Sequence, residues 1–141
     1  MLNSAHHSDL HQVVVIGAGQ AGLSVSQPRQ QHGIRPLVLE KNRIGHAWDQ
    51  QRWDSFCLVT PNWQCQLPDF PYDGDQPDGF MAKKSIVNYL QRFAQQVNAD
   101  LREGVAVERL TPIGNGYQKH VQLGDIGIEV TEYDRWLRHS V

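Results

Sequence analysis

The chain has 141 residues, enough for one domain of ordinary size, and 40% of them are hydrophobic, so it can bury a core. Its net charge of −2 gives no electrostatic basis for binding nucleic acid or an anionic membrane, and we expect neither partner. No apolar run approaches the ~20 residues that span a bilayer, and residues 1–12 lack a signal-peptide layout, which favours a cytoplasmic protein.

Residues 12–40 carry the pattern of a strand, a turn, a helix and a second strand. The β-branched run at residues 13–16 predicts a strand buried on both faces of a parallel sheet. The sequence GAGQAG follows at residues 17–22, and Gly33 is placed to end the helix that begins there in a left-handed conformation. Residues 37–39 predict the second strand, with Glu40 at its carboxyl end.

Pro28 lies inside the expected helix, six residues beyond Gly22. Proline has no N–H to bond the carbonyl of Ser24, and its ring presses on that carbonyl, at a typical cost of ~3 kcal/mol. We therefore expect the helix to kink or stop near residue 27.

Residues 41–79 predict an irregular, aromatic-rich excursion that holds three of the four tryptophans and four of the seven prolines. Loops this long in a compact domain are usually functional or disordered, and the aromatic content argues against disorder. A helix follows over residues 85–97, because apolar residues recur there at steps of three and four. Residues 101–110 alternate like a strand, and residues 117–130 predict one or two short strands.

The GxGxxG motif is typical of a turn that holds a dinucleotide pyrophosphate. Gly17 permits the tight turn, Gly19 lets the backbone approach the phosphate, and Gly22 lets the helix pack close to the sheet. The phosphate then meets free N–H groups and the positive end of the helix dipole. Glu40 is placed to accept both ribose hydroxyls. The alternative to a dinucleotide site is a tight strand–helix turn that binds no ligand. The glycines and Glu40 also fit FAD and NAD equally well.

The segment after Glu40 resembles flavin-dependent monooxygenases. In those enzymes an acidic residue precedes a Gly-Gly-x-Trp element along the flavin nucleotide, and this chain has Gly45-His46-Ala47-Trp48. The likeness continues through the sequences at residues 52–55, 58–61, 67–68 and 70–71 to the helix, and covers roughly residues 13–110. The chain is similar to the N-terminal part of the flavin-containing monooxygenase superfamily, and resembles most closely a bacterial branch of flavin-dependent oxidoreductases.

The resemblance implies an α/β fold, in which a Rossmann-like βαβ unit binds FAD as a small-molecule cofactor and the excursion lies along it. The glycine turn would hold the pyrophosphate, Glu40 with Lys41 the ribose, Thr60 the flavin end, and the backbone of Val107 the adenine. The implied cofactor-binding residues are Gly17, Gly19, Gln20, Ala21, Gly22, Glu40, Lys41, Gly45, Trp48, Thr60 and Val107.

Several of these aromatic and polar residues also have plainer interpretations. Trp48 fits a core position, and the Thr60–Pro61 pair fits a simple turn. Trp53 and Trp63 are predicted to be packing residues only. Arg52 could face a phosphate or pair with Asp54, and the sequence does not decide between them. The separated cysteines at positions 57 and 65 predict reduced thiols, and no metal site is expected.

Two departures from the family pattern affect the expected function. His46 stands where the superfamily has its second glycine, which narrows the room for the cofactor. The chain also has no second GxGxxG motif for NADPH. We therefore expect a truncated product, with a polar leader at residues 1–11, the N-terminal part of an FAD-binding domain at residues 12–112 and a divergent segment at residues 113–141.

The functional hypothesis is the FAD-binding portion of a flavin-dependent oxidoreductase or monooxygenase, which in the full-length family depends on NADPH and O₂. Because the NADPH motif is missing, we expect no NADPH-dependent turnover from the chain alone, and we assign no catalytic residue. The alternatives are a non-catalytic remnant with weak or no FAD binding and a stand-alone NAD-binding module. An incomplete sheet would also leave an unpaired edge through which copies could associate.

Overall fold

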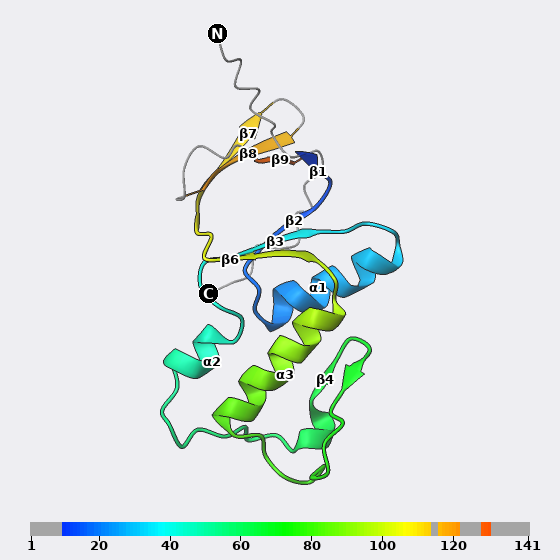
Figure 1. Cartoon of the computed structure of the whole chain (residues 1–141), viewed down its shortest axis with the longest axis vertical. Coiled ribbons are helices and arrows are strands. Elements are labelled where there is room, and N and C mark those ends of the chain that lie inside the picture. Colours follow the sequence, from blue (N-terminus) through cyan, green and yellow to red (C-terminus); the bar gives the residue numbers. More distant parts are fainter. Residues whose placement is uncertain (1–9, 114–115, 122–127, 131–141) are drawn as a thin grey trace.

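The computed structural model describes residues 10–113, 116–121 and 128–130. A three-stranded parallel sheet in the order β2-β3-β6 lies at its centre (Figure 1), formed by Val14–Ile16, Leu37–Glu40 and Asp100–Glu103. Helix α1, Gln20–Gln31, joins β2 to β3, and such a crossover is what two parallel neighbouring strands require. The predicted strand–turn–helix–strand unit and the Rossmann-like α/β class are therefore confirmed.

Strand β3 is buried on both faces. Val38 packs in the main core with side chains of α1 and of α3, the helix at Lys83–Gln96. Leu37 and Leu39 point to the other face, where Val105 and Val107 cover them. Strand β2 is different, because it pairs only with β3 among the described residues, and its last residue, Ile16, is 51% exposed. The prediction that residues 13–16 are buried on both faces is therefore wrong for Ile16.

We expected a kink or a stop near residue 27. Helix α1 continues through Pro28 and ends at residue 31, so the stop is wrong, and the kink stays a prediction. Leu23, Ser26 and Gln27 are buried, which holds this part of the helix against the core. The hydroxyl of Ser26 also donates to the carbonyl of Gly22 at 2.8 Å. Tertiary packing thus offsets the cost of the proline. The left-handed conformation predicted for Gly33 is confirmed by its φ of +76°, two residues beyond the end of the helix.

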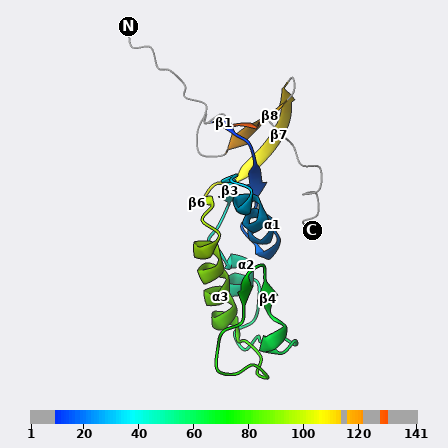
Figure 2. The same cartoon turned by 90° about the vertical axis from the view of Figure 1, so that its right-hand side faces the viewer.

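A second sheet has the strand order β1-β9-β8-β7, from Leu10–His11, Ile128–Val130, Gly116–Val121 and Val107–Ile113. Figures 1 and 2 both show it at one end of the molecule, with α3 reaching towards the other end. The single strand predicted over residues 101–110 is wrong, because the chain turns at Gly104 (φ +72°) and divides into β6 and β7 of different sheets. The two short strands predicted after residue 117 are confirmed.

The excursion is mostly irregular, as predicted. It contains the five-residue helix α2 (His46–Gln50), the 3-10 turn η1 (Asn62–Gln64) and a hairpin of β4 (Gln66–Leu67) with β5 (Phe70–Pro71). Trp53 and Trp63 are 65% and 54% exposed, so neither belongs to the buried core. The packing role predicted for Trp53 is confirmed by its edge-on ring contact with Phe56 at 5.0 Å.

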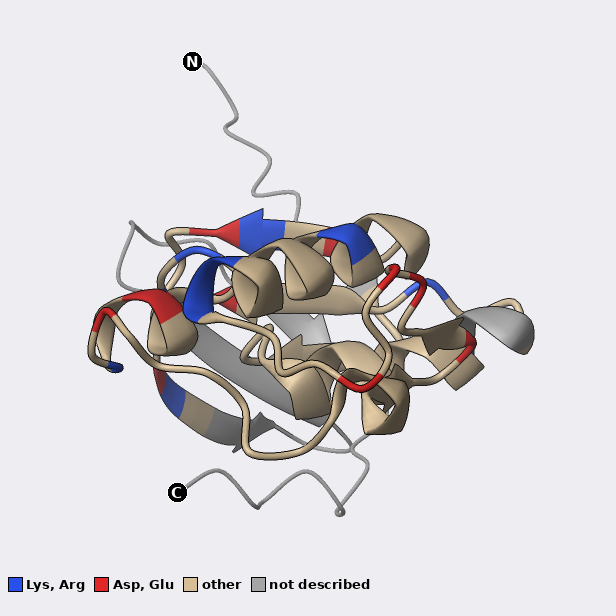
Figure 3. Cartoon of the chain, turned by 90° about the horizontal axis from the view of Figure 1, so that it is seen from below, with Lys and Arg blue, Asp and Glu red and all other residues tan. Residues whose placement is uncertain are grey.

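The surface of the described part is mixed in charge. Figure 3 shows Lys and Arg interspersed with Asp and Glu along the ribbon. No helix among the described residues is both long and apolar enough to cross a membrane.

Candidate nucleotide-binding site

The glycine turn joins the end of β2 to the start of α1. Gly17 has a φ of +96°, a conformation that side chains disfavour, and its N–H donates to the carbonyl of Leu39 on β3 at 2.7 Å. This bond fixes the turn to the sheet. The first N–H groups of α1 have no partner inside the helix, so the turn presents them where a phosphate can accept them.

The other two glycines of the motif have different surroundings. A Cβ on Gly22 would lie 2.0 Å from the carbonyl oxygen of Gly17 and 3.2 Å from a methyl group of Val15. Close packing of the helix on the turn therefore requires a glycine, which is the role predicted for Gly22. A Cβ on Gly19 would meet nothing within 4 Å. The space beside Gly19 is open to a ligand.

Glu40 lies at the carboxyl end of β3 and is half-buried. Its Oε2 accepts the N–H of Ala18 at 2.8 Å, and its Oε1 accepts the N–H of Asn42 at 2.9 Å. The carboxylate thus holds the glycine turn and the start of the excursion together, a role that the sequence reasoning missed. A carboxylate has about four lone-pair sites, so these two bonds leave room for ribose hydroxyls. Lys41 is exposed beside it.

A cavity of about 200 Å³ lies next to the turn and brings together Gln20, Trp48 and Thr60. These three predicted site residues come from α1, α2 and the excursion. Side chains of the excursion, the β4–β5 hairpin and α3 complete the wall: Leu58, Gln64, Cys65, Gln66, Leu67, Met81, Ile86, Tyr89 and Leu90. The lining mixes apolar side chains with uncharged polar ones and holds no ionised group, so the cavity suits a ring system with polar edges better than a charged group.

Two polar groups in the lining are neutral at physiological pH. Burial raises the pKa of the Cys65 thiol and of the Tyr89 phenol above their ordinary values. Both cysteines of the chain are free, as predicted. Within the described ranges, no group of His, Cys, Asp or Glu side chains comes together to hold a metal ion.

Gly45 serves the packing of α2 against α3. It caps α2 with a φ of +81°, and a Cβ there would lie 3.0 Å from a methyl group of Val87. The residue is buried and is not part of the cavity wall. His46, which follows it, also lies outside the lining.

Trp48 packs on the core, as its plainer interpretation predicted, and it also lines the cavity. Its contact with the nucleotide stays a prediction. Its ring lies 5.8 Å from that of Phe56, and the guanidinium of Arg52 lies 5.3 Å from the Trp48 ring centre. Arg52 therefore stacks on aromatic rings, while Asp54 pairs with Lys83 at 2.9 Å. Arg52 makes no ion pair with Asp54 in the described part of the chain, so that alternative for Arg52 is wrong.

Val107 lies apart from the cavity, at the start of β7, and packs with the cluster of Leu37 and Leu39. The chain approaches Glu40 two residues earlier, where the N–H of Val105 donates to the Glu40 carbonyl at 2.9 Å. The adenine contact implied for Val107 stays a prediction.

The fold and the glycine turn define a dinucleotide-binding unit of the Rossmann type. No known protein-family profile matches this chain. The chain is 42% identical over 85 residues to an uncharacterized CzcO-like oxidoreductase of Geobacillus kaustophilus, across 60% of this chain and 24% of that protein. It is 31% identical over 127 residues to the indole-3-pyruvate monooxygenase YUCCA6 of Arabidopsis thaliana, across 88% and 30%.

Among solved structures, a flavin-containing monooxygenase from Stenotrophomonas maltophilia superposes with a TM-score of 0.77 at 26% identity, over 87% of this chain and 37% of that one. A bacillithiol disulfide reductase from Staphylococcus aureus shares the fold with a TM-score of 0.75 at 14% identity, over 87% of this chain and 36% of that one. The chain is homologous to part of the flavin monooxygenase-like oxidoreductases, as the resemblance implied. It spans about a fifth to a third of the length of the curated relatives that it matches.

Proposed function

We propose that this chain binds FAD at the glycine turn and in the adjoining cavity, as the FAD-binding part of a flavin-dependent oxidoreductase or monooxygenase. One observation carries the proposal. Gln20, Trp48 and Thr60 belong to separate segments, the family resemblance implies all three as cofactor contacts, and they line the same cavity.

The described residues fit such a cofactor. The open side of Gly19 and the first turn of α1 suit the pyrophosphate, and the Glu40 carboxylate has lone pairs left for the ribose. The cavity of about 200 Å³ is below the ~300–1,000 Å³ typical of whole-ligand pockets, so it would take one ring system of the dinucleotide. Bound FAD would supply the redox chemistry, while these residues bind and orient it.

We further infer that the whole-protein reaction depends on NADPH and O₂, as the likeness to flavin monooxygenases suggests. The similar YUCCA6 protein is an indole-3-pyruvate monooxygenase, which supports this inference. The sequence offers one GxGxxG motif, at residues 17–22, and that motif is the one we assign to FAD. A cytoplasmic location belongs to the same proposal.

A stand-alone NAD-binding module is the alternative to weigh. The unbroken helix α1 removes one reason against it, because an NAD module needs that helix intact. The aromatic excursion still favours FAD, since Trp48 and Thr60 close a cavity beside the turn.

The test is to purify the chain and titrate it with FAD and, separately, with NAD⁺. We expect FAD to bind with a change in the visible flavin spectrum, and Gly19→Ala to weaken that binding because its Cβ would occupy the open side of the turn. Tight binding of NAD⁺ without binding of FAD would favour the module, and binding of neither would contradict the proposal.

A further inference from the structure

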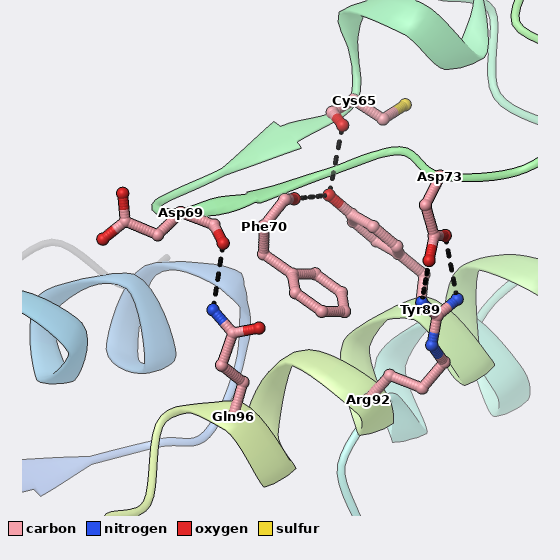
Figure 4. A network of polar contacts seen from close by, with 7 residues as sticks. All are labelled: Cys65, Asp69, Phe70, Asp73, Tyr89, Arg92 and Gln96. Atoms are coloured by element: carbon pink, nitrogen blue, oxygen red, sulfur yellow. Dashed lines mark hydrogen bonds and ion pairs between the residues drawn. The ribbon is translucent and has the colours of Figure 1, made fainter.

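One face of α3 holds the β4–β5 hairpin through polar contacts. Tyr89, Arg92 and Gln96 are spaced at i, i+3 and i+7, so they share one side of the helix. Figure 4 shows all three reaching across to the segment from Cys65 to Asp73. The hairpin is thus attached to the helix at its strands, at its turn and just beyond β5.

The Tyr89 hydroxyl bridges the two strands. It accepts the N–H of Leu67 at 3.4 Å and donates to the carbonyl of Phe70 in a shorter contact, and these two residues are directly opposed in the hairpin. It also lies 3.1 Å from the carbonyl of Cys65, which accepts the N–H of Tyr72 at 3.0 Å. A phenol has a single hydrogen to donate. The carbonyl of Phe70 therefore depends on Tyr89 more than the carbonyl of Cys65 does.

The other two residues on this face of α3 hold the turn of the hairpin and the chain just beyond β5. Gln96 donates to the carbonyl of Asp69 at 2.9 Å, in a turn where Asp69 has a φ of +54° that few residues adopt. Arg92 forms a two-point ion pair with Asp73, with one contact at 3.2 Å, which lowers the pKa of that carboxyl. Both are exposed and add less than the buried hydroxyl.

This hairpin is also a wall of the candidate cofactor cavity. Cys65, Gln66 and Leu67 line the cavity, and so does Tyr89 itself. We propose that Tyr89 is a positioning residue, whose hydroxyl sets the place of the β4–β5 wall and thereby the fit of the cofactor ring. That the ligand is FAD rests on the proposed function. That Tyr89 holds the hairpin rests on the hydrogen bonds described above.

The first experiment measures the wall without a ligand. In a Cys57→Ser background, Cys65 is the one thiol, and its rate of reaction with a thiol reagent reports opening of the hairpin. Tyr89→Phe should raise this rate about tenfold, the equilibrium factor of one lost hydrogen bond. Tyr72→Phe is the matched control, because it removes the same atom from a residue whose side chain makes no hydrogen bond in the described structure. An unchanged rate in Tyr89→Phe would overturn the proposal.

The second experiment titrates the same variants with FAD. We expect Tyr89→Phe to weaken binding several-fold and to change the visible spectrum of the bound flavin, with native far-UV circular dichroism, while Tyr72→Phe does neither. Gln96→Leu releases only the exposed turn of the hairpin. We expect it to weaken FAD binding and change the flavin spectrum in the same direction as Tyr89→Phe, but by a smaller amount. A faster Cys65 reaction with unchanged affinity and spectrum would reduce Tyr89 to a structural residue and overturn the positioning role. If the parent chain fails to bind FAD, the proposed function is overturned, and so is the claim that Tyr89 positions a wall for FAD. The thiol reaction rates would still measure whether Tyr89 holds the hairpin closed.

Discussion

The carboxylate of Glu40 ties β3 to the glycine turn, because its Oε2 accepts the backbone N–H of Ala18 at 2.8 Å while its Oε1 accepts that of Asn42 at 2.9 Å. An acidic residue at this place is usually explained by its ribose contact. Here the same side chain also holds the glycine turn in place through a hydrogen bond that needs no ligand. We therefore expect a substitution at Glu40 to affect the stability of the fold in addition to the proposed ribose contact.

Replacement of Glu40 by Gln should destabilise the chain by ~1–3 kcal/mol, because an amide has one acceptor oxygen and would turn its NH₂ group towards the second N–H. The midpoint of urea unfolding measures this loss. Glu103→Gln is the matched control, since the Glu103 carboxylate accepts a single hydrogen bond among the described residues, from the N–H of Ile44 at 2.8 Å, and an amide oxygen can accept the same bond. Equal shifts in the two variants would contradict the double role of Glu40.

The two glycines at positions 19 and 22 should separate binding from folding. Gly22→Ala places a methyl group 2.0 Å from the Gly17 carbonyl, and overpacking of this kind costs ~1–3 kcal/mol or more, so we expect a large loss of unfolding free energy. Gly19→Ala adds a methyl group in open space and should change stability by no more than ~0.5 kcal/mol. Denaturation curves of both variants check this. A Gly19→Ala variant as unstable as Gly22→Ala would show that open space is not what distinguishes the two sites.

The local pattern of residues 12–40 was predictable because a glycine motif between two buried runs has few other structures. Helix α3 was equally clear, since its apolar stripe is long. The cavity was only partly predictable: Trp48 and Thr60 came from the family likeness, while the contribution of Leu58 and Tyr89 depends on how the irregular excursion folds back. Tyr89 was visible as a member of the apolar stripe, but no sequence signal showed that its hydroxyl bridges a hairpin.

The errors also have physical causes. The helix continues through Pro28 because buried neighbours on the same helix outweigh a local cost. The strand predicted over residues 101–110 divides because Gly104 adopts a positive φ, and a glycine inside an alternating run hides such a turn.

Asp100 and Arg102 should give the stability of the chain a weak acid dependence. Their ion pair at 3.0 Å lowers the pKa of Asp100, chiefly through the hydrogen bond from Arg102. A carboxyl whose folded pKa is depressed stabilises the fold above its unfolded pKa of ~3.9, and this contribution is lost as the pH falls through the lower folded value. Both side chains are 35% exposed, so solvent screening limits the effect to ~0.2–1 kcal/mol.

The measurement compares Asp100→Asn with the parent chain in urea at pH 7 and again at a pH below the folded pKa. We expect the variant to be less stable at pH 7 and the difference to disappear in acid. Asp78→Asn is the control, because Asp78 is exposed and has no ion pair among the described residues. A difference that persists unchanged in acid would show that the charge of Asp100 is not its cause.

Pro28→Ala should stabilise the chain. Pro28 is exposed in the interior of α1, where proline costs ~3 kcal/mol relative to alanine because it lacks the N–H for the Ser24 carbonyl and crowds it. Part of this gain is lost, because alanine leaves the unfolded chain with more freedom than proline does, so we expect ~1–2 kcal/mol in urea unfolding. Gln20 lies at the far end of the same helix, and Trp48 and Thr60 lie on other segments, so FAD affinity should stay the same. A destabilised Pro28→Ala chain would instead show that α1 depends on the bend or rigidity that the proline provides, and that the helix tolerates Pro28 for a reason beyond the packing of its buried face.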